Sequence, residues 1–293
     1  MDELVNDIMG KKQSSNSYKN NTNTKWKEEQ SRKRQQAFSK MEKMSFVVKT
    51  NGEMFQKYLD IQSRFNRNSV GNCLIILTDK PNAMQFKDKK SWKELNVNVK
   101  AYNEPFTILE PEEKNGKRYF NPKDVFDISQ TDSNIPDYKD THTEEELLAG
   151  YLYDCKAEKE VVNKLPDDSI GIKYDSETNK LYICRGMEKT DRFQALGNEL
   201  ANIELRANEE NHYKDFKCKC ISYMLCKKYN IDVSNYDFTD IPSELQFKDN
   251  GTDIRKELDT IRLAYNSIND RIQERFEKGF NSEKNRSTKV QER

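Results

Sequence analysis

One segment of the sequence has the spacing of a zinc site but lacks the residues that bind zinc. It reads Asn198-Glu199-Leu200-Ala201-Asn202, within a stretch with helical patterning. Positions four apart share one face of a helix, and two histidines there would hold zinc while the glutamate between them served as general base. Asn198 and Asn202 occupy both ligand positions, and an amide oxygen is a poor zinc ligand beside imidazole. We therefore expect no working zinc peptidase and assign no catalytic residue.

No other catalytic pattern replaces it. The chain has two histidines, His142 and His212. Cys218, Cys220 and Cys226 have no Cys-x-x-Cys spacing, which favours buried free thiols over a metal site. There is no G-x-G-x-x-G phosphate loop and no G-x-S-x-G elbow. We therefore expect no cofactor and no metal.

The charge is unevenly distributed. The formal net charge is zero, with 50 basic and 50 acidic side chains. Residues 10–50 carry eleven Lys/Arg against three Asp/Glu, residues 51–100 nine against five, and residues 101–250 twenty against thirty-one. A basic front and an acidic middle indicate an anionic partner for the front, although a solvated polar face is the simpler alternative.

The patterning predicts an α+β protein with a small α+β domain, a mainly helical domain with a short sheet, and a long C-terminal helix. We divide the chain into a basic, partly disordered arm (1–37), the front domain (38–131), a linker (132–142), the second domain (143–250) and an amphipathic helix with a tail (251–293). Residues 10–25 are the stretch expected to be disordered. A helix is expected over 26–48, with Phe38, Met41 and Met44 or Ser45 on its apolar stripe. Asn68-Ser69 and Thr143 are predicted to begin helices, and Asn115-Gly116 is predicted to form a hairpin turn.

The order of residues in the front domain resembles the N-terminal single-stranded-DNA-binding domain of ArdC-type antirestriction proteins of plasmids and other mobile elements. The resemblance is carried by Tyr58-Leu59-Asp60, Pro81-Asn82-Ala83, Trp92, Ile108-Leu109-Glu110-Pro111 and Val125 to Thr131. The sequence departs from the family where a glycine-containing turn is usual, because Lys100-Ala101-Tyr102-Asn103-Glu104 stands there.

Binding of single strands without sequence preference needs a positive groove and aromatic faces on which bases stack. The front domain supplies both, and Trp92 also fits a core position in a short helix. The predicted nucleic-acid-binding residues are Arg64, Arg67, Lys80, Phe86, Lys87, Lys89, Lys90, Trp92, Lys93, Lys100 and Tyr102.

The second domain looks like the zincin-type peptidase domain that follows in ArdC-like proteins and is similar to ImmA/IrrE peptidases. The resemblance implies a third, acidic ligand near the start of the next helix, where Lys217-Cys218-Lys219-Cys220 stands instead. The degenerate site is thus Asn198, Glu199, Asn202 and Lys217, and the protein is expected to be a pseudo-metallopeptidase.

The preferred interpretation is a single-stranded DNA-binding, antirestriction-like protein of a mobile genetic element. Two alternatives stay open. One is an interaction protein, whose acidic middle mimics DNA or binds a host protein. The other is a metallopeptidase with atypical ligands. No signal peptide or apolar span is visible and the cysteines lack framework spacing, so we expect a cytoplasmic chain with no membrane partner. The oligomeric state is not encoded in any pattern we recognise.

Overall fold

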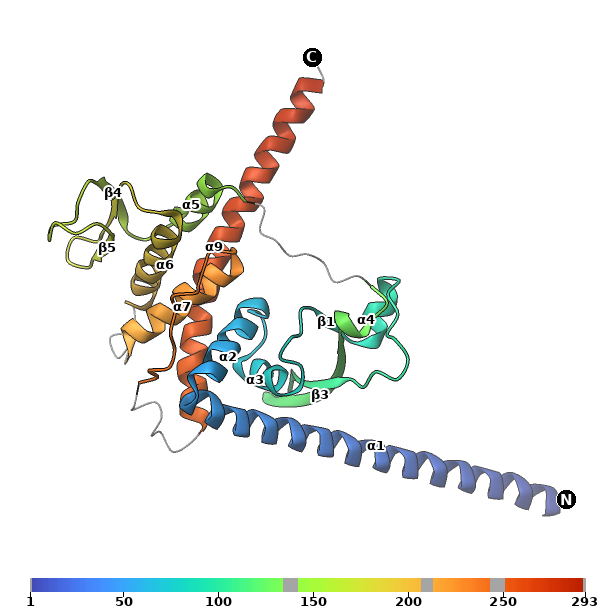
Figure 1. Cartoon of the computed structure of the whole chain (residues 1–293). Coiled ribbons are helices and arrows are strands. Elements are labelled where there is room, and N and C mark those ends of the chain that lie inside the picture. Colours follow the sequence, from blue (N-terminus) through green and yellow to red (C-terminus); the bar gives the residue numbers. More distant parts are fainter. Residues whose placement is uncertain (1, 134–141, 207–212, 243–250, 292–293) are drawn as a thin grey trace.

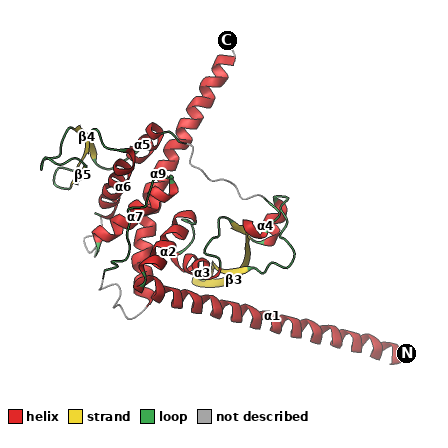
Figure 2. Cartoon of the chain, in the orientation of Figure 1, coloured by secondary structure: helices red, strands yellow, loops and turns green. Residues whose placement is uncertain are grey.

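The computed structural model describes residues 2–133, 142–206, 213–242 and 251–291. The chain is an α+β protein whose helices outweigh two small sheets (Figure 2). Its front part consists of α1 (Asp2–Thr50), α2 (Gly52–Arg64), α3 (Val70–Asp79), β1 (Phe86–Lys87), α4 (Lys89–Glu94), β2 (Phe106–Lys114), β3 (Lys117–Asp127) and the 3-10 turn η1 (Ile128–Gln130). Its second part consists of α5 (Glu144–Leu152), β4 (Glu158–Val162), β5 (Ile172–Asp175), β6 (Lys180–Cys184), α6 (Lys189–Leu205), α7 (Lys214–Lys228) and α9 (Gly251–Gln291).

The first helix is longer than the sequence indicated. α1 includes residues 10–25, which were expected to be disordered, and its N-terminal end projects away from the rest of the molecule (Figure 1). The segment contains no proline and only Gly10 as a glycine, so no residue in it interrupts helical hydrogen bonding. The predicted apolar stripe is confirmed at Ser45, which is buried, and at Met41 and Met44, which pack against the core. It is wrong at Phe38, which is exposed, while Ala37 and Val48 are buried instead.

Local signals set several boundaries correctly. The Ser69 hydroxyl accepts from the Asn72 N–H and begins α3, and Thr143 with Glu146 forms a capping box at the start of α5. Asn115 and Gly116, both with positive φ, turn β2 into β3. β3 pairs antiparallel with both β2 and β1. In the second sheet β6 lies between β4 and β5, parallel to the first and antiparallel to the second.

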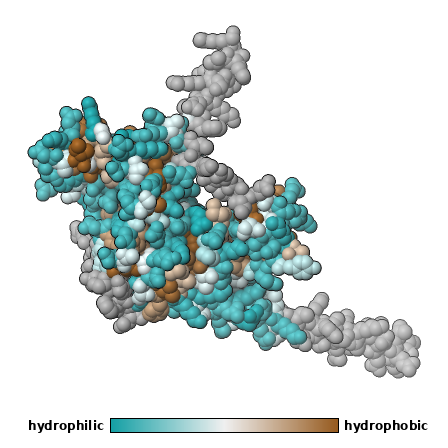
Figure 3. All heavy atoms as spheres, in the orientation of Figure 1, coloured by the Kyte–Doolittle hydropathy of each residue, from teal (hydrophilic) through white to brown (hydrophobic). Residues whose placement is uncertain are grey.

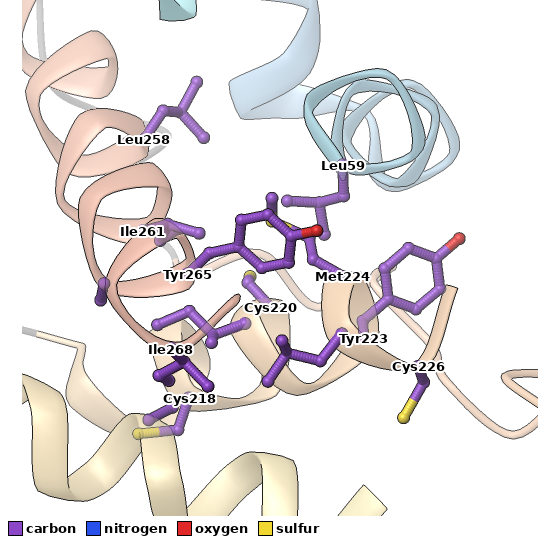
Figure 4. Packing of buried hydrophobic residues seen from close by; sticks show 14 of the residues in the cluster. Leu59, Cys218, Cys220, Tyr223, Met224, Cys226, Leu258, Ile261, Tyr265 and Ile268 are labelled. Atoms are coloured by element: carbon purple, nitrogen blue, oxygen red, sulfur yellow. The ribbon is translucent and has the colours of Figure 1, made fainter. Parts of the chain in front are cut away.

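The hydrophobic core continues across the predicted domains. One cluster of buried side chains includes Leu59 of α2, Met224 of α7 and Tyr265 of α9. Figure 4 shows these three helices meeting, with their apolar side chains between them. The predicted apolar face of the C-terminal helix is buried in this cluster from Ile254 to Ile272. The front part and the second part are therefore packed against each other, with α9 contacting both.

The face seen in Figure 3 is largely hydrophilic, with small hydrophobic patches between charged side chains. Within the described residues, no helix has both the length and the apolar character needed to cross a membrane. The predicted linker falls mostly on residues 134–141, which lie outside the described residues.

Candidate functional site

The Glu199 carboxylate is held by two hydrogen bonds. Glu199 Oε2 accepts from the backbone N–H of Tyr174 at 3.0 Å and from Nδ2 of Asn202 at 3.1 Å. Tyr174 lies on β5, an edge strand of its sheet, so the carboxylate ties α6 to that edge. Asn198 and Asn202 are half-buried on the same face of α6. Glu199 and Asn202 are thus bonded to each other, and Glu199 is engaged in a structural contact with β5.

Lys217 does not face this cluster. It is 4% exposed, and its ammonium lies 2.6 Å from the Glu257 carboxylate of α9. The residue of α7 whose charge environment includes Glu199 is Cys218. Burial raises the pKa of the Cys218 thiol to about 12, with Lys214 opposing the rise and Glu199 adding to it. Neighbouring side chains on a helix point about 100° apart, so Lys217 and Cys218 face different parts of the molecule. The sequence alone did not show which of the two faces Glu199.

The cysteines of α7 do not converge on a common point. Figure 4 shows Cys218, Cys220 and Cys226 spread along the helix and pointing in different directions. Burial also raises the pKa of Cys226 to about 12, which keeps the thiol protonated and unreactive. In the described part of the chain, no three Cys, His, Asp or Glu side chains are grouped as metal ligands would be, and His212 lies outside that part.

Three of the predicted nucleic-acid-binding residues of the front part are bonded within the fold. Trp92 is 2% exposed and donates from Nε1 to the Phe126 carbonyl at 2.8 Å. Arg64 donates to the Ala83 carbonyl at 2.5 Å and to the Pro81 carbonyl at 3.2 Å. Arg67 makes a two-pronged ion pair with Asp270 of α9, with nitrogen–oxygen distances of 2.7 and 3.2 Å. Trp92 is therefore a core residue, which was the simpler alternative.

Phe86 packs in a cluster of aromatic rings. Its ring centroid is 4.9 Å from that of Phe65 and 5.5 Å from that of Phe106. It also borders a cavity of about 620 Å³ between the front part and the end of α7. The same cavity is lined by Arg64, Lys227 and Lys228. Phe86 and Arg64 were predicted to bind nucleic acid, whereas the two lysines were not.

The remaining cations gather around α4 and the segment that follows it. Lys80 and Lys87 are half-buried, whereas Lys89, Lys90, Lys93 and Lys100 are exposed. Lys90 lies 3.8 Å from Glu94. Among the described residues, Lys89 and Lys93 make no ion pair. Hydrogen bonds from Asn98 lower the pKa of Asp132, and the charge of the nearby Lys100 adds to this effect. These charges are available to an anionic partner.

Tyr102 has an unusual backbone conformation. Its φ is +65° and the residue is completely exposed, at 103% of its reference area. A bulky residue in the left-handed region is a true outlier, because its Cβ crowds the backbone at a cost of about 1–2 kcal/mol. Tyr102 thus occupies a turn position that suits glycine, within the segment where the sequence departs from the ArdC pattern.

Two solved structures resemble this arrangement. They are crystal structures of the antirestriction protein ArdC from plasmid R388, one with Mn(II) bound and one metal-free. The first is 14% identical, with a TM-score of 0.46, and the match covers 69% of this chain and 84% of that chain. The second is 13% identical, with a TM-score of 0.44, and covers 70% and 84%. A likeness at this level says nothing about activity.

No protein-family model matches the chain, and no curated protein matches it. The functional argument therefore rests on the residues of this chain.

Proposed function

We propose that this protein binds single-stranded DNA through the exposed basic side chains around α4 and has no peptidase activity. The observation that carries the proposal is the set of exposed lysines Lys89, Lys93 and Lys100, together with the fully exposed Tyr102 two residues after Lys100. Lysines supply the sequence-independent attraction to phosphates, and the tyrosine ring supplies a face on which a base stacks.

The strained backbone of Tyr102 supports a functional role. Left-handed conformations of bulky residues persist where the surroundings impose them, and they gather at binding sites. A tyrosine with no covered surface gains nothing from packing that would offset this strain. A ligand base that stacks on the ring would account for an aromatic residue at this strained position.

The chemistry at α6 supports the second half of the proposal. A zinc peptidase needs imidazole or carboxylate ligands and a free carboxylate that takes a proton from the metal-bound water. Here amides stand at both histidine positions, and Glu199 already accepts from Tyr174 and Asn202. The α6 region then serves as a folded support for the DNA-binding part.

The biological setting comes from the resemblance of the front sequence to ArdC-type antirestriction proteins. In that setting the protein belongs to a plasmid or another mobile element and covers an entering single strand. Its partner is single-stranded DNA.

Fluorescence anisotropy with a labelled single-stranded oligonucleotide tests DNA binding, at about 50 and about 200 mM salt. If three phosphates are neutralised, the slope of about −0.7 per phosphate predicts an affinity loss of about 20-fold over this range. The double variant Lys89→Glu/Lys93→Glu should bind much more weakly, whereas Lys57→Glu, on an exposed lysine of α2 that pairs with Glu53, is the control. Equal binding to duplex DNA, or no binding at low salt, would disprove the proposal.

A further inference from the structure

A groove of about 700 Å³ lies where α1, the start of α3, the β2–β3 hairpin and α9 meet. Phe38 of α1, Arg118 and Phe120 of β3 and Arg262 of α9 are among its lining residues. Of the residues predicted to bind nucleic acid, only Arg67 borders it. We call it the Arg118–Phe120 groove.

The groove has an aromatic wall that solvent reaches. Phe38 is 37% and Phe120 36% exposed, and their rings meet edge to face with centroids 6.0 Å apart. The Arg118 guanidinium lies over the Phe120 ring, 5.5 Å from its centroid. Residues 118 and 120 share one face of β3 because side chains alternate along a strand, whereas Tyr119 points to the opposite face.

The charge in the groove favours an anion. Both of its carboxylates are already paired, Glu110 with Lys123 at 2.7 Å and Asp259 with Arg262 at 2.8 Å. Arg118 forms no ion pair within 4.0 Å among the described residues, although Glu113 stands opposite it in the β2–β3 ladder. An unpaired arginine beside an exposed ring matches a phosphate beside a base, since arginine binds phosphate in a forked geometry.

We propose that the Arg118–Phe120 groove binds a second segment of the single-stranded DNA, with a base on Phe120 and a phosphate at Arg118. This inference rests on the proposed function. β3 leads from the groove toward β1 and α4, and its residues 120–127 span about 23 Å at 3.3 Å per residue. A single strand that contacts both places crosses from the Phe120 face of β3 to the opposite face, where Lys123 lies 3.3 Å from Asp88 at the start of α4. The groove thus adds to the affinity of a long oligonucleotide.

The test is fluorescence anisotropy of the full-length chain with labelled oligothymidine of about 20 nucleotides. Phe120→Ala should weaken binding between about 5-fold and about 150-fold, because stacking contributes about 1–3 kcal/mol per base. Phe120→Leu retains an apolar side chain but has no aromatic face, and it should weaken binding similarly. Arg118→Gln should weaken binding several-fold and reduce the salt slope by about 0.7.

Tyr119→Ala is the matched control. It removes an aromatic ring that is 47% exposed, from the same strand but the opposite face, and should leave binding within about twofold. If the wild-type chain does not bind the oligonucleotide, the proposed function itself fails. If the wild type binds and Lys89→Glu/Lys93→Glu weakens it, while the Arg118 and Phe120 variants bind as Tyr119→Ala does, only the groove is overturned. A loss of affinity with Tyr119→Ala equal to that with Phe120→Ala would also overturn it.

Discussion

The backbone N–H of Tyr174 donates to Glu199 across 3.0 Å, so the carboxylate at the centre of the degenerate motif fastens an edge strand to α6. The same oxygen accepts from Asn202, one of the two amides that stand where a His-Glu-x-x-His motif would have histidine. The polar side chains of this helix face satisfy one another and the strand. Glu199 therefore has a structural role in holding β5 against α6.

This contact predicts how Glu199 variants behave. Glu199→Ala removes the acceptor of the Tyr174 N–H and should lower the free energy of unfolding by about 1–3 kcal/mol. Glu199→Gln keeps an acceptor oxygen and should cost less than about 1 kcal/mol. Urea unfolding followed by circular dichroism measures both. Equal stability of the alanine variant and the wild type would contradict the structural role.

Because Lys217 and Glu257 form a buried ion pair, the stability cost of replacing one should depend on whether the other is still charged. Lys217→Met leaves the Glu257 carboxylate, whose side chain is 15% exposed, without its partner and should cost about 3 kcal/mol. Replacing both residues, as Lys217→Met with Glu257→Leu, should restore most of that loss, because no unpaired charge remains. A double-mutant cycle in urea measures the coupling. Additive losses would show that the two charges do not interact.

The surroundings of Glu204 on α6 should make the stability of the fold sensitive to acid. Burial alone would raise its pKa, but hydrogen bonds from Arg271 and Ser267 and the charges of Arg271 and Lys156 outweigh it and hold the pKa below the ordinary 4.5. A carboxyl group with a lowered folded-state pKa stabilises the fold above its unfolded-state pKa, and that stability is lost as the pH falls through the folded-state value.

Thermal unfolding between about pH 7 and about pH 3 tests the role of Glu204. The wild type should lose stability below about pH 4.5. Glu204→Gln should be less stable than the wild type at neutral pH and should change less on acidification. Parallel pH profiles for the two proteins would assign the acid sensitivity to other groups.

What the sequence predicted well was local. The helix starts at Ser69 and Thr143 and the turn at Asn115-Gly116 depend on a few neighbouring residues, whose chemistry is visible in the sequence. Lys217 was misplaced because its direction is set by Glu257, forty residues later in the chain. The Arg118–Phe120 groove was missed because its walls come from α1, β3 and α9. The one available signal was the Arg-x-Phe alternation directly after the hairpin turn.

Replacing Tyr102 should change the stability of the fold and its affinity for DNA in opposite directions. Tyr102→Asn places in the left-handed position a residue that adopts it more readily. Since the tyrosine ring is fully exposed, no packing is lost. The free energy of unfolding should therefore rise, by up to about 1 kcal/mol. The same substitution removes the stacking face and should weaken binding of a single-stranded oligonucleotide by at least about 5-fold.

Two further variants decide between the ring and the loop as the source of the effect. Tyr102→Phe keeps both the ring and the strain, so its affinity and its stability should match those of the wild type. Tyr102→Ala lacks the ring and, having a Cβ, keeps most of the strain, so it should bind as weakly as Tyr102→Asn while being less stable than that variant. Anisotropy and urea unfolding on the same four proteins give both quantities. If Tyr102→Asn is more stable yet binds as well as the wild type, the tyrosine is not a stacking residue and the lysines around α4 act without it.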